Sequence, residues 1–209
     1  MLDIDDTLDR VHGRQQLSLF HAHHDSRCFL PIHIYEAASG KPVAVILRPG
    51  KTPDGAEVAL VLRHVVRAIR RRWPAVDILV RGDSHYGRPE AMAWLERNRV
   101  GYISGLGGNP VLLGKVRHLA EDAAVARVGD EGGKARRFGT FRYTAKTWPV
   151  ERQVIARVEA SAIGSSRSPG GRSAELTGAA TAGSSSPISR ARRAGGTRRS
   201  TAPAARPRI

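Results

Sequence analysis

The sequence predicts an α/β domain in which helices flank a mixed β-sheet. Three observations support this fold class: strand-like apolar runs lie within the first 50 residues, a segment of helical periodicity follows, and strand-like and helix-like segments alternate up to about residue 110. At 209 residues, the chain is long enough for one domain with its own core and an appendage.

The first three predicted strands lie before the first helix. Met1 to Ile4 is interpreted as a shortened first strand. Cys28 to Tyr35 and Pro42 to Leu47 are apolar or alternating runs, and Ser39-Gly40-Lys41 between them predicts a hairpin.

A helix is predicted next, because apolar residues now repeat at intervals of three and four. Asp54 is a suitable N-cap and Glu57, three residues later, a suitable reciprocal partner, while Pro74 ends the segment. The repeating residues are Val58, Val61, Leu62, Val65, Val66 and Ile69.

Two further strands and one helix complete this unit. Val76 to Val80 predicts a strand, Pro89 to about Asn98 a helix, and Val100 to Ser104 another strand. The predicted elements follow the order of the ribonuclease H-like fold: three strands, a helix, a strand, a helix and a strand. The helix between the third and fourth strands favours a parallel, right-handed crossover.

The rest of the chain divides into an addition to the domain and a tail. We predict a helix from roughly Pro110 to Val125, and a β-hairpin formed by Arg136 to Ala145 and Arg152 to Glu159. Residues 161–209 are dominated by Ser, Gly, Ala, Arg and Pro, so they are predicted to be disordered. The predicted boundaries are 1–160 for the domain, with its core at about 1–110, and 161–209 for the tail.

The charge of the chain indicates a nucleic-acid partner. The formal net charge is +15 and the sequence pI is about 11.3. The tail holds nine Arg and one acid, Glu175, so it carries +8 and the body carries +7. The single Cys28, the lack of a long apolar run and the acidic start of the chain predict a soluble protein of the cytoplasm without a membrane partner.

Carboxylates follow two of the predicted strands. Asp5 lies where the first strand runs into a loop, and Asp83 follows the strand that ends at Val80. If these strands are neighbours, the two carboxylates can share Mg²⁺ or Mn²⁺. Asp3 and Asp5 lie on one face of the strand, so Asp3 is a candidate third metal contact or a support for the site. The alternative for each is an Asp that only caps a turn.

Several motifs, in order, resemble the catalytic domain of bacterial insertion-sequence transposases of the DDE superfamily, and most resemble the subgroup numbered 1380 among insertion sequences. The resemblance covers about residues 1–160. The motifs are Leu2 to Leu8, Val11-His12-Gly13-Arg14-Gln15-Gln16, Leu47-Arg48-Pro49-Gly50, Trp73-Pro74, Arg81-Gly82-Asp83-Ser84-His85-Tyr86-Gly87, and Gly105-Leu106 with Asn109.

This resemblance implies a ribonuclease H-like core in which three acids bind two divalent metal ions. The first acid follows the first strand in an Asp-x-Thr context, which Asp5-Asp6-Thr7 matches, and the second corresponds to Asp83. The third, a Glu in a Tyr-x-x-Arg-x-x-x-Glu setting on a late helix, has no match, and the surroundings of Glu175 differ from that setting. We therefore expect negligible strand cleavage or transfer by this chain.

The composition of the tail and the start of the chain suggest a truncated transposase, with a frameshift as the hypothesis for the tail. The tail resembles an out-of-frame reading of a GC-rich gene, and the chain begins inside the first strand. This hypothesis predicts that the missing motif lies in another frame just downstream.

The resemblance also implies partners and contacts. DNA, as transposon ends and target, is the expected partner, with a second copy or an intact transposase as a further one, in the bacterial cytoplasm. Arg81 and Arg88 flank Asp83 and are candidates for contacting phosphate. His85 is a candidate for the same site, with a simple turn residue as the alternative.

Two alternative functions remain open on the sequence. Asp3-Ile4-Asp5-Asp6-Thr7 also matches the nucleophile motif of haloacid dehalogenase-like phosphatases, with Asp3 as nucleophile and Asp5 as acid and base, although position 87 is Gly where their late motif needs Asp. The other alternative is a non-catalytic DNA-binding remnant.

Overall fold

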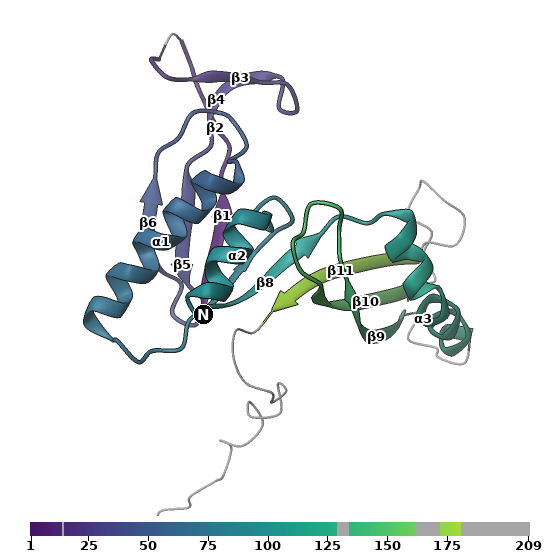
Figure 1. Cartoon of the computed structure of the whole chain (residues 1–209). Coiled ribbons are helices and arrows are strands. Elements are labelled where there is room, and N and C mark those ends of the chain that lie inside the picture. The colour runs from purple at the N-terminus through teal and green to yellow at the C-terminus, as the bar shows by residue number, and fades with distance from the viewer. Residues whose placement is uncertain (14, 129–133, 162–171, 181–209) are drawn as a thin grey trace, which may run out of the picture.

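The computed structural model of the chain describes residues 1–13, 15–128, 134–161 and 172–180 (Figure 1). Within them, an eight-stranded sheet has the order β6-β5-β1-β7-β8-β11-β10-β9, and a three-stranded sheet has the order β2-β4-β3. The strands are β1 (Leu2–Asp6), β2 (Asp9–Arg10), β3 (Leu19–His21), β4 (Ser26–Phe29), β5 (Ile32–Glu36), β6 (Lys41–Ile46), β7 (Leu79–Gly82), β8 (Gly101–Leu106), β9 (Lys134–Tyr143), β10 (Arg152–Ser161) and β11 (Arg172–Ala180); the helices are α1 (Gly55–Arg72), α2 (Pro89–Arg97) and α3 (Pro110–Val128).

The five strands β6-β5-β1-β7-β8 form a mixed sheet. β1 is parallel to β7, and β7 is parallel to β8, whereas β5 is antiparallel to both β1 and β6. This arrangement, with helices between the later strands, confirms the predicted α/β class and is consistent with the ribonuclease H-like fold.

The main core lies between this sheet and the pair α1 and α2, which contact each other (Figure 1). Ile32, Ile34 and Val58 are fully buried there. The predicted periodicity of α1 is confirmed, since its buried positions include Val58, Val61, Leu62, Val65 and Val66. Burial of a side chain of this size contributes about 1.5–3 kcal/mol, so this stripe holds α1 on the sheet.

The predicted cap of α1 is confirmed only in part. The side chain of Asp54 accepts a hydrogen bond from the backbone N–H of Glu57. The Glu57 carboxylate does not reach back to the cap, because it forms a bidentate ion pair with Arg48 at 2.6 and 2.7 Å. Arg48 is buried and also donates to the carbonyls of Leu30 and Lys51.

A second core lies under α3, which packs on β9 and β10. Leu112, Val116 and Ala123 of the helix meet Ala156 and Val158 of β10 there. The helix predicted from Pro110 and the hairpin predicted across residues 136–159 are both confirmed.

An ion pair joins the hairpin of β9 and β10 to helix α2, which packs on the five-stranded part of the sheet. Arg152, in β10, donates to both carboxylate oxygens of Glu96, in α2, at 2.7 and 3.0 Å. Tyr102 also donates to Glu96, and the Arg152 guanidinium lies over the Trp148 ring. Arg152 is only 3% exposed, so these partners offset the cost of burying its charge.

Two sequence predictions are corrected. The single strand expected over Cys28 to Tyr35 is two strands, β4 and β5, in different sheets, because Pro31 interrupts the run and cannot donate a ladder hydrogen bond. The disorder expected after residue 160 is contradicted for Arg172–Ala180, which forms β11 between β8 and β10. The other tail residues, 162–171 and 181–209, lie outside the described residues.

Among the described residues, no helix combines the length and the apolar character that crossing a membrane requires.

Candidate active site

Two acids lie at the carboxyl ends of adjacent parallel strands: Asp83 follows β7, whereas Asp5 is the last but one residue of β1, which extends beyond the predicted end at Ile4 to Asp6. The β1 and β7 ladder pairs Asp3 with Arg81 and Ile4 with Gly82. Asp5 and Asp83 are the next residues in that register, so the predicted neighbourhood of their two strands is found. A carboxylate in this position is held by the sheet and remains open to solvent, and both residues are exposed.

The loop after β7 is held by close backbone contacts. A Cβ on Gly105, in β8, would lie 2.8 Å from the Ser84 nitrogen and 3.2 Å from the Asp83 carbonyl carbon. Only a glycine fits this approach without a shift of the loop. Tyr86 is 5% exposed and anchors the other side of the loop in the main core.

His85 links two of the carboxylates. Its Nε2 lies 2.9 Å from Asp6 Oδ2, and its Nδ1 lies 2.8 Å from Asp83 Oδ1. The backbone N–H of His85 also donates to Asp83 Oδ1. When protonated, the imidazole donates from both nitrogens, which matches two carboxylate partners.

The charges at this site shift three pKa values. The hydrogen bond to Asp6 raises the pKa of His85, burial opposes that rise, and the charges of Asp83, Asp6 and Asp5 add to it. The same hydrogen bond lowers the pKa of Asp6 against a rise from burial. Burial is the main cause that raises the pKa of Tyr86, and the three carboxylates add to it. All three acids therefore lie within electrostatic reach of one imidazole.

Asp5 and Asp83 each keep one carboxylate oxygen available. Asp5 Oδ1 accepts the N–H of Asp6, and Asp83 Oδ1 is bound to His85. Within the described ranges, Oδ2 of each makes no hydrogen bond or ion pair. Hard carboxylate oxygens suit Mg²⁺ or Mn²⁺, so the donor chemistry of these two acids fits such an ion. No set of three or more Asp, Glu, His or Cys side chains in the described part of the chain is arranged to hold a metal.

Asp3 has a different partner. Arg81 donates to both of its carboxylate oxygens at 2.8 and 2.6 Å, across the β1 and β7 ladder. This bidentate pair occupies both Asp3 oxygens, which would otherwise bind a metal ion or attack a phosphate. It also occupies the Arg81 guanidinium, which would otherwise contact a phosphate. The metal role of Asp3, the phosphate role of Arg81 and the phosphatase alternative all stay predictions, and this contact counts against each of them.

The two other residues predicted to contact nucleic acid, Arg88 and His85, form hydrogen bonds within the loop after β7 or with the acids. The Nε of Arg88 donates to the carbonyl of His85, so it stabilises the loop that carries Asp83. His85 is itself occupied by Asp6 and Asp83. Their predicted contacts with nucleic acid stay predictions.

Sequence reasoning missed Asp6. It is partly buried and bonds to His85 and, at 3.4 Å, to the hydroxyl of Tyr86. One signal was available: Asp6 lies two residues after the core residue Ile4, so it shares the inward face of the strand.

A family model described as transposase DDE domain group 1 matches residues 1–168 of the chain. The search of curated proteins found no match to the chain.

Proposed function

Since the chain belongs to the family of transposase DDE domains, group 1, we propose that it is the catalytic part of an insertion-sequence transposase and that Asp5 and Asp83 are two acids of its metal site. The observation that supports this most directly is the register of β1 and β7, in which the two acids are the next aligned residues after Ile4 and Gly82. The subgroup numbered 1380 among insertion sequences is the source we propose.

The role of each residue follows from its contacts. Asp5 and Asp83 would hold a divalent ion through their free Oδ2 atoms. In the family's two-ion chemistry, divalent ions held there would supply Lewis acidity: one would activate a water or a 3′-hydroxyl for attack on a DNA phosphodiester, and the second would stabilise the leaving oxygen. His85 orients Asp83 through two contacts to Oδ1, and in its protonated form it offsets part of the repulsion among the carboxylates.

We propose further that this chain cleaves DNA negligibly. Two carboxylates can bind one ion weakly, because Mg²⁺ keeps several of its waters when few protein ligands are present. The family's third acid has no match in the sequence, and Glu175 has different surroundings.

Calorimetric titration of the full chain with Mn²⁺ tests the metal site. The heat of binding should be lost in Asp83→Asn and in Asp5→Asn. Asp77→Asn is the matched control, since Asp77 is also exposed but precedes β7 at the other end of the strand. Wild-type Mn²⁺ binding in both site variants would refute the assignment.

A supercoiled-plasmid assay with Mg²⁺ or Mn²⁺ tests the proposed inactivity. The chain should leave the plasmid intact. Cleavage that disappears in Asp83→Asn would overturn the inactivity and support the site, whereas cleavage that persists in Asp83→Asn would count against both.

A further inference from the structure

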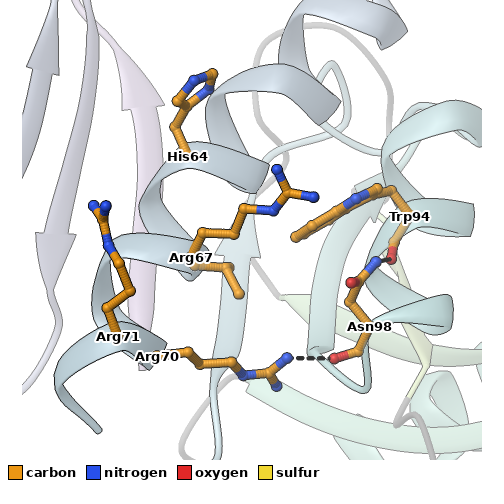
Figure 2. A pocket seen from close by; sticks show the side chains of 7 residues that line it. His64, Arg67, Arg70, Arg71, Trp94 and Asn98 are labelled. Atoms are coloured by element: carbon orange, nitrogen blue, oxygen red, sulfur yellow. Dashed lines mark hydrogen bonds between the residues drawn. The ribbon is translucent and has the colours of Figure 1, made fainter. Parts of the chain in front are cut away.

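A basic groove lies between α1 and α2 (Figure 2). Its volume is about 550 Å³. Both helices contribute side chains to it, chiefly His64, Arg67, Arg70, Arg71, Trp94 and Asn98.

The groove concentrates positive charge without acidic partners. Arg63, Arg67 and Arg71 follow one another at intervals of four and therefore share one side of α1. Within the part of the chain that the structure describes, none of them forms a hydrogen bond or an ion pair. Arg72, Arg97 and Arg99 add three further exposed guanidinium groups at the same end of the two helices. Favourable interaction with the helix dipole accounts for cations in the last turn of α1, but not for Arg63 and Arg67.

One arginine of the groove has a structural role. Arg70 donates to the carbonyls of Asn98 and Arg99 at 2.6 and 3.1 Å, and it thereby satisfies carbonyls just past the end of α2 (Figure 2). The Asn98 side chain in turn donates to the Trp94 carbonyl. These bonds fix the spacing of α1 and α2, so the groove is preformed.

The groove lies along the second half of α1, and neither Asp5 nor Asp83 lines it. α1 ends at Arg72, shortly before β7 begins at Leu79, whereas Asp83 follows the other end of β7. The groove is therefore a surface separate from the one that carries Asp5 and Asp83.

We propose that this groove binds the sugar–phosphate backbone of DNA, as a second contact surface separate from the carboxylate site. The charge selects a polyanion, because clustered arginines without acidic partners repel one another until an external anion neutralises them. Guanidinium groups match phosphate geometry, and the partly exposed Trp94 ring offers a flat surface for a sugar or a base. The choice of DNA as the polyanion rests on the proposed function.

The test compares the DNA affinity of two double variants of the full chain, each of which loses two positive charges. Arg67→Ala/Arg71→Ala removes two exposed groove arginines. Arg117→Ala/Arg142→Ala removes two arginines that are 81% and 65% exposed on α3 and β9. Binding of each to a fluorescent 20-base-pair duplex, a length chosen at about two helical turns, is measured by anisotropy across a salt series. EDTA is present throughout, so the result does not depend on the metal site.

We expect the groove variant to reduce the slope of log affinity against log salt by about two, one for each lost phosphate contact. The control should keep the wild-type slope, and the Arg-rich tail is the same in every chain. Equal loss in both variants would mean that only total charge matters and would overturn the proposal, as would an unchanged groove variant.

Hydrogen exchange gives an independent readout. Duplex binding to the wild-type chain should slow exchange in α1 near Arg67. Protection confined to other segments would contradict the proposed groove. Melting curves check that both variants are folded, which is expected because the Arg67 and Arg71 side chains make no intramolecular hydrogen bond or ion pair in the described structure.

Discussion

His85 Nδ1 lies 2.8 Å from Asp83 Oδ1, while the other ring nitrogen of His85 contacts Asp6. A single imidazole thus connects the end of β1 with the loop after β7. The loop carries a proposed metal ligand, so its position depends on this ring as well as on the sheet.

Replacing His85 by alanine should lower the free energy of unfolding by about 1–2 kcal/mol at pH 6. The folded-state pKa of His85 is raised, so its stabilising contribution is fully present below the unfolded pKa of about 6.5 and is lost as pH rises through the folded value. Urea unfolding in EDTA should therefore show a smaller difference between wild type and His85→Ala at pH 9 than at pH 6. A difference that does not change with pH would contradict the charged form of the ring.

Glu57→Ala should destabilise the protein far more than the loss of an exposed acid. Removal of Glu57 leaves the buried Arg48 guanidinium with only two carbonyl partners, at a cost of about 2–3 kcal/mol. Glu121→Ala is the control, because Glu121 meets Arg117 in an exposed helical pair worth about 0.3–0.5 kcal/mol. Similar urea midpoints for the two variants would show that the Arg48 pair has no special role.

Gly105→Ala should displace the Asp83 loop. The added Cβ would meet the backbone of Ser84, and accommodating it should cost about 1–3 kcal/mol and weaken Mn²⁺ binding. Gly107→Ala is a close control, since a Cβ there meets nothing within 4 Å. Calorimetric titration and urea unfolding of both variants make the comparison. Equal behaviour of the two would mean that β8 does not position the loop.

Glu36 should contribute to stability above acidic pH. Its carboxylate accepts the backbone N–H groups of Ala38 and Ser39, and these bonds lower its pKa from 4.5 to about 2. Because the folded-state pKa is depressed, the contribution is present above pH 4.5 and is lost as pH falls towards 2. In Glu36→Gln, the fall of unfolding free energy between these pH values should be less steep than in wild type. Identical acid profiles would refute this assignment.

The sequence predicted the parts of the fold that depend on local patterns. The spacing of Val58 to Ile69 was sufficient for α1, and alternation was sufficient for the hairpin of β9 and β10. β11 could not be predicted in this way, because its Ser, Ala and Gly content is weak in strand preference and its pairing depends on the free edges of β8 and β10.

The two main acids of the candidate site could be predicted from their positions near the ends of predicted strands. Asp5 and Asp83 could be selected because each was expected at the end of a strand; Asp5 lies in the last residues of β1, Asp83 follows β7, and the two strands are neighbours. The contacts of Asp6 with His85 and of Asp3 with Arg81 join residues almost 80 positions apart. Such contacts depend on the register of two distant strands, which no local pattern specifies.

The ion pair between Arg152 and Glu96 connects the hairpin of β9 and β10 to the helix that follows the proposed metal site. Glu96 lies in α2, and α2 begins at Pro89, six residues after Asp83. A partner that displaces β10 would therefore be expected to displace α2 and, through its first turn, the loop that carries Asp83, the proposed metal ligand. A change in the position of the hairpin would in this way change the position of the Asp83 loop.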